Sequence, residues 1–384
     1  MSTTVEPDSP AAAPTPPTAA EDTVPDAEAT TTVPGRYDQW VAGEGANPAR
    51  TKHWDSMGPQ GKPDIGWRIP VEIDGDPVAH DGILYASFAD QTVRALDIRT
   101  GAEIWSREIS FGGRTPTVTG DAVYFVDGKN IVATDKETGT EELLVITPPD
   151  EFTTSPQAPL IVDGVAYLTY LRLTDGVWTN TVVAHDLATR MSRWRWAAES
   201  SRALLPLMVG ADAIVVADGE QLLVLDLVLG FERWKTAWEE ERSPNAAMIV
   251  DDAVVVRDTR LRVFELADGT LRWSTPDSSL HYASAEGLVF TQSLDVRAYD
   301  VRTGAEAWRA PWEGRILSDE IAVGERVVYV KGTRGGELAA FDAVTGEELW
   351  ALAFGGGFRP RATLLAHNGV LVAVDGDEHL VAFI

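Results

Sequence analysis

Short apolar stretches alternate with polar turns along most of this chain, and one order of residues recurs in them. An apolar strand ends in an acidic residue, a Thr-Gly turn follows, and a Trp comes four residues after the glycine. The clearest copies are Ala95–Trp105, Ala298–Trp308 and Ala340–Trp350, and weaker copies centre on Asp135, Asp186, Asp226 and Glu265. The acids lie about 35 to 51 residues apart, which is the length of one four-stranded blade. The pattern therefore predicts a β-propeller.

A second turn precedes the acid in each repeat and is followed by a short β-rich run. Asp-Gly and Asn-Gly pairs between alternating apolar residues are typical of hairpin turns, because glycine tolerates a positive φ. Eight such runs follow Gly82, Asp121, Gly164, Asp212, Asp252, Gly287, Glu325 and Gly369. Their number predicts eight blades, and no long helix is expected.

The two ends of the repeat region complement each other. Leu380–Ile384 forms the third strand of a last repeat that lacks its Trp-bearing fourth strand. The stretch Gly66–Val71 has the sequence of that fourth strand and lies just before the first blade. We therefore expect the N-terminal strand to complete blade 8, which closes the ring and removes an open sheet edge.

Trp occupies seven of the eight equivalent positions in the repeat, and Leu143 occupies the eighth. A buried aromatic side chain removes roughly 200 Å² from water, so we expect each indole to dock between neighbouring blades. The predicted docking residues are Trp67, Trp105, Trp194, Trp234, Trp273, Trp308 and Trp350.

The A-[LYF]-D-x-x-T-G-x-x-x-W repeat resembles the PQQ-like repeat of eight-bladed β-propellers, over residues 66–384. Trp40 and the stretch Gly45–Thr51 are similar to the lead-in of secreted or membrane-anchored members. The resemblance implies an all-β propeller of four-stranded antiparallel blades. It leaves the activity open, because such propellers include quinoprotein dehydrogenases, the propeller lipoprotein of the outer-membrane barrel-assembly machinery and sensor domains of membrane kinases.

Composition divides the chain into three segments. Residues 1–36 are rich in Pro, Ala, Thr and acids and predict a disordered acidic tether. Residues 37–65 are expected to be a lead-in that packs on the propeller of residues 66–384. No apolar signal or membrane-spanning run is present in the sequence. An extracellular or cell-envelope location is favoured, with membrane attachment only through a tether outside this chain, and a cytoplasmic location is the alternative.

The formal net charge of −27 disfavours nucleic-acid binding, and the expected partner is a protein or peptide bound by a monomer. The resemblance to quinoprotein dehydrogenases implies PQQ stacked on a disulfide between adjacent cysteines, with a bound Ca²⁺. The chain has no cysteine, so we expect neither PQQ nor Ca²⁺. The six histidines are scattered among the blades without metal-ligand spacing, and no catalytic, cofactor or metal residue is predicted.

Irregular loops are the remaining candidates for function, because loops on a rigid scaffold concentrate binding residues. Three of them, at Thr169–Asn180, Ala310–Asp319 and Phe354–Arg361, are expected to lie together over one end of the central channel. Trp, Phe and Arg are enriched at protein interfaces. The candidate partner-binding residues are Arg172, Trp178, Trp312, Arg315, Phe358 and Arg359.

Two classes of function stay open. The first is a non-enzymatic scaffold that binds a protein or peptide at this loop face. The alternative is a propeller that binds a small molecule or a PQQ-type cofactor at the channel mouth, as a degenerate quinoprotein dehydrogenase would.

Overall fold

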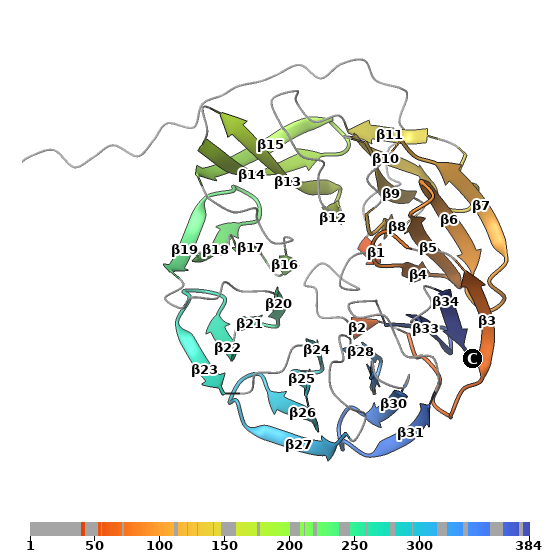
Figure 1. Ribbon diagram of the computed structural model, residues 1–384. Coiled ribbons are helices and arrows are strands. Elements are labelled where there is room, and N and C mark those ends of the chain that lie inside the picture. Colours follow the sequence, from red (N-terminus) through yellow and green to blue (C-terminus); the bar gives the residue numbers. More distant parts are fainter. Residues whose placement is uncertain are drawn as a thin grey trace, which may run out of the picture.

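The strands form an eight-bladed β-propeller, as the repeat predicts (Figure 1). The protein is described by a computed structural model over residues 40–384, apart from 43–52, 55, 71–72, 111–113, 121, 129, 141, 147–158, 175–176, 200–207, 211, 218–220, 238–245, 258–259, 277–280, 294, 313–320, 333–336, 354–363 and 376–378. Within the described ranges the chain forms strands and turns but no helix.

The first four blades follow one another along the chain, each an antiparallel meander of four strands. Blade 1 comprises β4 (Val78–His80), β5 (Ile83–Phe88), β6 (Thr92–Asp97) and β7 (Glu103–Glu108). Blade 2 comprises β8 (Thr117–Thr119), β9 (Ala122–Asp127), β10 (Asn130–Asp135) and β11 (Glu142–Ile146). Blade 3 comprises β12 (Leu160–Val162), β13 (Val165–Thr174), β14 (Val177–Asp186) and β15 (Met191–Glu199). Blade 4 comprises β16 (Met208–Gly210), β17 (Ala213–Ala217), β18 (Gln221–Asp226) and β19 (Glu232–Ala237).

The remaining blades repeat this plan. Blade 5 comprises β20 (Ala246–Val250), β21 (Ala253–Arg257), β22 (Leu261–Glu265) and β23 (Leu271–Thr275). Blade 6 comprises β24 (His281–Ala285), β25 (Leu288–Gln292), β26 (Asp295–Asp300) and β27 (Glu306–Pro311). Blade 7 comprises β28 (Ile321–Gly324), β29 (Val327–Lys331), β30 (Glu337–Asp342) and β31 (Glu348–Ala353). Blade 8 comprises β32 (Leu365–His367), β33 (Val370–Val374) and β34 (His379–Phe383), completed by β3 (Ile65–Pro70).

The pairing of β3 with β34 closes the ring in the predicted register. Trp67 lies opposite Ala382, and Arg68 lies opposite Val381. The side chains of Val381 and Phe383 are buried. The prediction that the N-terminal strand completes blade 8 is therefore confirmed.

Two sheets have a fifth strand that the repeat did not predict. β1 (Trp40–Ala42) pairs antiparallel with β8, and β2 (His53–Trp54) pairs parallel with β28. β8 and β28 are the first strands of their blades, and these first strands lie nearest the central axis (Figure 1). The segment before the first blade therefore adds to the sheets from inside the ring.

The order of the strands gives the propeller two different ends. The turn face carries the turns between first and second strands and between third and fourth strands. The loop face carries the hairpins between second and third strands and the links between blades. β1 begins beside Thr119, close to the turn face, whereas the predicted binding loops belong to the loop face.

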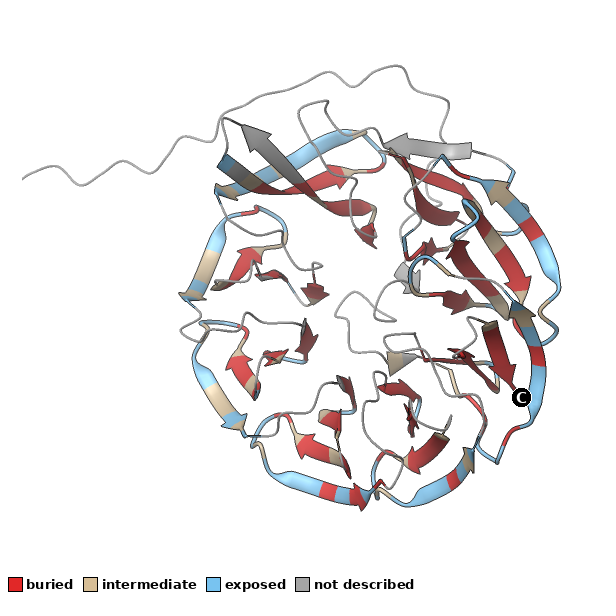
Figure 2. Cartoon of the chain, in the orientation of Figure 1, coloured by how far each residue is buried: buried red, intermediate tan, exposed pale blue. Residues whose placement is uncertain are grey.

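Burial follows from the way the blades stack. The second and third strands lie between neighbouring blades, so both of their faces are covered, as in β9, where five successive residues are buried. The fourth strands form the outer rim and are mostly exposed, as in β7 and β31, where one residue of six is buried (Figure 2). The core consists of apolar layers between adjacent blades.

Candidate functional site

Seven of the eight blades carry an indole that reaches outside the blade. The Nε1 of the repeat's Trp donates a hydrogen bond of 2.7 to 3.2 Å to a backbone carbonyl outside its own blade. Six acceptors lie in the next blade's turn between third and fourth strands. These six pairs are Trp67 with Ile98, Trp105 with Lys136, Trp194 with Leu227, Trp234 with Leu266, Trp273 with Val301 and Trp308 with Ala343. Trp350 donates instead to Pro59, a residue just before β3.

The glycine of each Thr-Gly turn is required by this docking. At Gly346, φ is 72°, and an added Cβ would lie 2.6 Å from the ring of Trp308. The same relation holds at five other turns: Gly101 over Trp67, Gly139 over Trp105, Gly230 over Trp194, Gly269 over Trp234 and Gly304 over Trp273. The Trp and the glycine of the repeat are thus one contact between two blades.

The acid that precedes the glycine organises the turn. Asp97 Oδ1 accepts hydrogen bonds from the backbone nitrogens of Arg99 and Thr100 and from the Thr100 hydroxyl. The Thr hydroxyl bond recurs in three other blades, at Thr138, Thr303 and Thr345. These bonds to the ionised form lower the pKa of Asp97, with the Thr100 hydroxyl as the largest cause.

The corresponding turn of blade 4 replaces its polar residues with apolar ones. Here the chain reads Asp226-Leu-Val-Leu-Gly-Phe, and Leu229 stands where four other blades have the hydrogen-bonded Thr. Val228 and Leu229 are each 67% exposed and Phe231 is 52% exposed. We call Val228, Leu229 and Phe231 the apolar turn. On the adjacent blade, Met191 at the start of β15 is 54% exposed.

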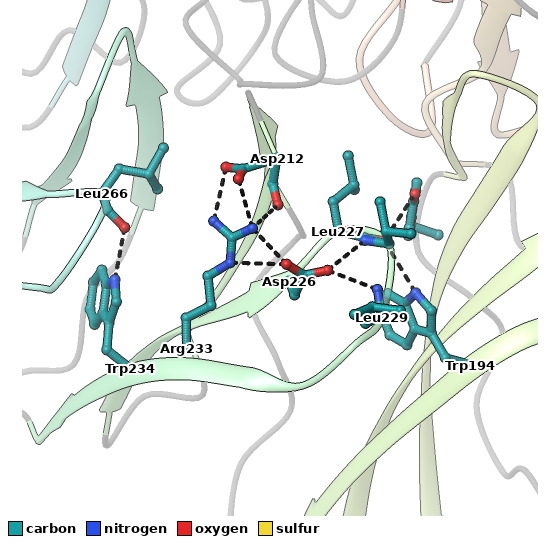
Figure 3. Close-up of polar contacts among 10 residues, drawn as sticks. Trp194, Asp212, Asp226, Leu227, Leu229, Arg233, Trp234 and Leu266 are labelled. Atoms are coloured by element: carbon teal, nitrogen blue, oxygen red, sulfur yellow. Dashed lines mark hydrogen bonds and ion pairs between the residues drawn. The ribbon is translucent and has the colours of Figure 1, made fainter.

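The backbone of the apolar turn is held firmly. Asp226 Oδ1 accepts from the backbone nitrogens of Val228 (3.0 Å) and Leu229 (2.8 Å). Trp194 donates to the Leu227 carbonyl at 3.2 Å (Figure 3). Its ring also lies against Gly230. These contacts fix the turn from two sides.

A cluster of ion pairs fixes the apolar turn further. Arg233 Nη2 lies 2.7 Å from Asp226 Oδ2 and 2.8 Å from Asp212 Oδ2, so it bridges the two turns of blade 4 (Figure 3). The hydrogen bonds from Arg233 are the largest cause of the lowered pKa of both carboxyl groups. The exposed apolar side chains are therefore displayed on a backbone that is already ordered, so binding a partner through them would not cost free energy for ordering the turn.

Exposure of these side chains brings the fold no benefit. A Thr at position 229 would add the hydroxyl bond that four other blades have, whereas an exposed Leu leaves apolar surface in water. A local departure from the repeat without a gain in packing is expected at functional sites. The apolar turn is therefore the best candidate site among the described residues.

The loop residues chosen from the sequence fall partly outside the described part. Arg315, Phe358 and Arg359 lie outside the described residues. Arg172 and Trp178 are backbone partners in β13 and β14, opposite Thr179 and Leu173, and their side chains are not among the described ones.

Two expectations about these loops are wrong. Thr169–Asn180 is not an irregular loop, because Val165–Thr174 and Val177–Asp186 pair along their whole length as a long hairpin. Trp312 is not in an exposed loop, because only 8% of it is exposed and its ring packs edge-on against Phe341 with centroids 6.2 Å apart. The Trp312 side chain belongs to the core between blades.

Sequence comparison matches the chain to the family described as outer membrane protein assembly factor BamB, over residues 89–177, 159–290 and 292–383. The chain belongs to this family. The chain is similar to the crystal structure of BamB from Moraxella catarrhalis, with a TM-score of 0.58 and 15% sequence identity. The match covers 83% of this chain and 97% of that chain.

Relatives of this BamB-family chain include enzymes. The serine/threonine-protein kinase AfsK of Streptomyces griseus is 32% identical over 161 residues, which is 39% of this chain and 19% of the kinase. The chain thus matches about a fifth of the length of that relative. Quinohemoprotein alcohol dehydrogenase from Comamonas testosteroni has a TM-score of 0.65 at 13% identity, covering 91% of this chain and 81% of that chain. These structural likenesses show the fold alone.

Within the described ranges, no group of three or more His, Asp or Glu side chains is placed to bind a metal ion. The described part also has no helix that is long and apolar enough to cross a membrane.

Proposed function

We propose that this protein is a non-enzymatic β-propeller scaffold that binds a protein partner through the apolar turn of blade 4, at the cell envelope. The observation that carries the proposal is the exposure of Leu229 beside Val228 and Phe231. Other blades have a hydrogen-bonded Thr at the position of Leu229. Exposed apolar side chains on a rigid turn can be buried by a partner at little ordering cost. The family's description as an assembly factor of outer membrane proteins supports both the partner class and the location.

The non-enzymatic part of the proposal rests on the residues present. A disulfide between adjacent cysteines, which the quinoprotein resemblance implies, cannot form in a chain without cysteine. The alternative of a small molecule at the channel mouth gains no specific support, and β1 and β2 already pair with two of the strands that line the channel.

Site-specific photo-crosslinking tests the proposal in cells that express the full chain. A benzophenone amino acid at position 229 should form a discrete adduct with one protein, and Phe231→Thr should abolish that adduct. Position 303 in blade 6 is the matched control, because Thr303 occupies the same place in its turn. Equal adducts at both positions, or an adduct at 229 that Phe231→Thr leaves intact, would contradict the proposal.

A substitution separates binding from folding. Leu229→Thr restores the residue of other blades, so the melting temperature should stay unchanged or rise slightly. Loss of a buried apolar anchor costs about 2 kcal/mol of binding, or roughly 30-fold in Kd. The crosslinked protein, once identified and purified, should bind this variant about that much more weakly by calorimetry. Unchanged affinity would contradict a role for the apolar turn.

A further inference from the structure

Exposed carboxylates surround the apolar turn on the turn face. Asp163, Asp212, Asp251 and Asp252 lie in the turns between first and second strands of blades 3, 4 and 5, and Asp268 lies in the turn between third and fourth strands of blade 5; all are exposed. The turn between first and second strands also carries an exposed acid in blades 1, 6 and 7, at Asp81, Glu286 and Glu325. The turn face is therefore acidic on nearly every described blade.

Two of the acids near the apolar turn are held in ion pairs within the fold. Arg233 pairs with Asp212, and Arg272 Nη2 lies 3.0 Å from Asp252 Oδ1. Within the described residues, Asp163, Asp251 and Asp268 form no such ion pair. These three carboxylates keep their charge available to a partner.

Contacts place the acids on both sides of the apolar turn. The Tyr167 hydroxyl lies 3.4 Å from the Leu227 carbonyl. Burial raises the pKa of that tyrosine, the charge of Arg193 opposes the shift, and the charge of Asp163 adds to it. On the other side, β19 leads from the apolar turn to Trp234, whose indole donates to Leu266 in the turn that holds Asp268. The apolar turn thus lies between two acidic turns of neighbouring blades.

We propose that the partner segment bound by the apolar turn is cationic, with two or three apolar anchors flanked by Lys or Arg. This inference rests on the proposed function and specifies its partner. Burial of Val228, Leu229 and Phe231 provides affinity, while the acids attract a basic segment and repel acidic ones. Attraction between exposed charges is screened beyond roughly 8 Å at physiological ionic strength, so the association rate should depend strongly on salt.

The test uses a displayed library of random 15-residue peptides, selected on the full chain and then synthesised. Selected peptides should combine apolar residues with a net positive charge, and they should lose binding on Leu229→Thr. Raising the salt from 50 to 300 mM should weaken binding about tenfold or more. The triple variant Asp163→Asn, Asp251→Asn and Asp268→Asn should slow association about five- to tenfold and leave dissociation unchanged.

A matched variant controls for total charge. Glu306→Gln, Glu347→Gln and Glu348→Gln remove three exposed acids from blades 6 and 7, and this variant should associate as the wild type does. If both triple variants slow association equally, the effect depends on net charge alone, and the proposal of a local acidic site is wrong.

The remaining outcomes separate the two proposals. Peptides that require Leu229 but are neutral or acidic, with salt-independent affinity, would overturn the cationic partner and leave the apolar turn in place. If no selected peptide requires Leu229, the proposed function fails as well. Leu229-dependent binding to phosphatidylcholine vesicles, or Leu229-dependent self-association by ultracentrifugation, would identify a lipid surface or a second copy instead and overturn both proposals.

Discussion

Glycine and tryptophan are coupled at the level of single residues, because the indole of one blade lies against the Cα of the next. The exception supports this relation. Where blade 2 has Leu143 in place of Trp, blade 3 has Arg190 in place of glycine, and Arg190 keeps the left-handed backbone with a φ of 61°. A side chain is thus found at this position where the preceding blade has no Trp.

A substitution at one of these glycines should be costly. Gly346→Ala should lower the free energy of unfolding by about 2 kcal/mol or more, because alanine is disfavoured in the left-handed region and its Cβ would meet the Trp308 ring at 2.6 Å. Thermal unfolding followed by calorimetry measures the effect. Arg190→Gly at the equivalent place is the control and should change stability by less than about 1 kcal/mol. Equal effects of the two changes would refute the coupling.

The residues of the candidate site show what the sequence can and cannot indicate. The replacement of Thr by Leu at position 229 is visible once the repeats are aligned, and the exposed Phe231 follows it. The sequence alone does not say that Leu229 is exposed, because an apolar residue in a turn is often covered by a neighbouring loop. Trp312 illustrates the opposite case, since an aromatic residue in an expected loop proved to be buried against Phe341.

At the level of strands, the repeat predicted the elements well but not their lengths. β13 and β14 have ten residues each, where most blades have strands of five or six. The alternation continues through Thr174 to an Asp-Gly pair, which is the same hairpin signal used for the other turns. The short β1 and β2 could not be foreseen, because two or three residues carry no periodicity and their pairing depends on the position of the ring.

The seam between blades 8 and 1 should respond to acid. His367 at the end of β32 accepts a hydrogen bond through Nε2 from the Gly82 nitrogen at 3.2 Å. Burial, followed by the nearby His80, lowers the pKa of His367 to about 4, while Asp81 opposes the shift. The unfolded chain binds this proton more readily, near pH 6.5. The stability that neutral His367 provides is therefore complete above pH 6.5 and is lost as the pH falls toward 4.

Melting temperatures measured from pH 7 to pH 4 test this seam. The wild type should lose stability over this range, and His367→Gln should lose less, because glutamine retains an acceptor but does not titrate. Part of the dependence should remain in the variant, since burial also lowers the pKa of His80. Asp186, with a pKa of about 2, contributes only at lower pH. Parallel curves for the two proteins would exclude His367 as the source.

For the whole molecule, ring closure dominates the expected stability. Deletion of residues 380–384 removes buried Leu380, Val381 and Phe383 and leaves β3 without its partner, so the shortened protein should aggregate or unfold without cooperativity. Removal of residues 1–36 should leave the melting temperature nearly unchanged, because the sequence offers few apolar residues for burial there. Scanning calorimetry with light scattering measures both. A stable, monomeric deletion of 380–384 would contradict the role of closure.

The pairing of β3 with β34 also sets a time order for folding. Trp67 and Ala382 are adjacent in the sheet but about 315 residues apart in the chain. At a synthesis rate of about 5 to 20 residues per second, β3 waits roughly 15 to 60 s for its partner strand. Contacts between such distant residues form slowly even in the complete chain. Throughout this interval a newly made molecule has an open ring with a free strand edge at β3. That edge has to be protected from pairing with other chains until β34 is synthesised and closes the ring.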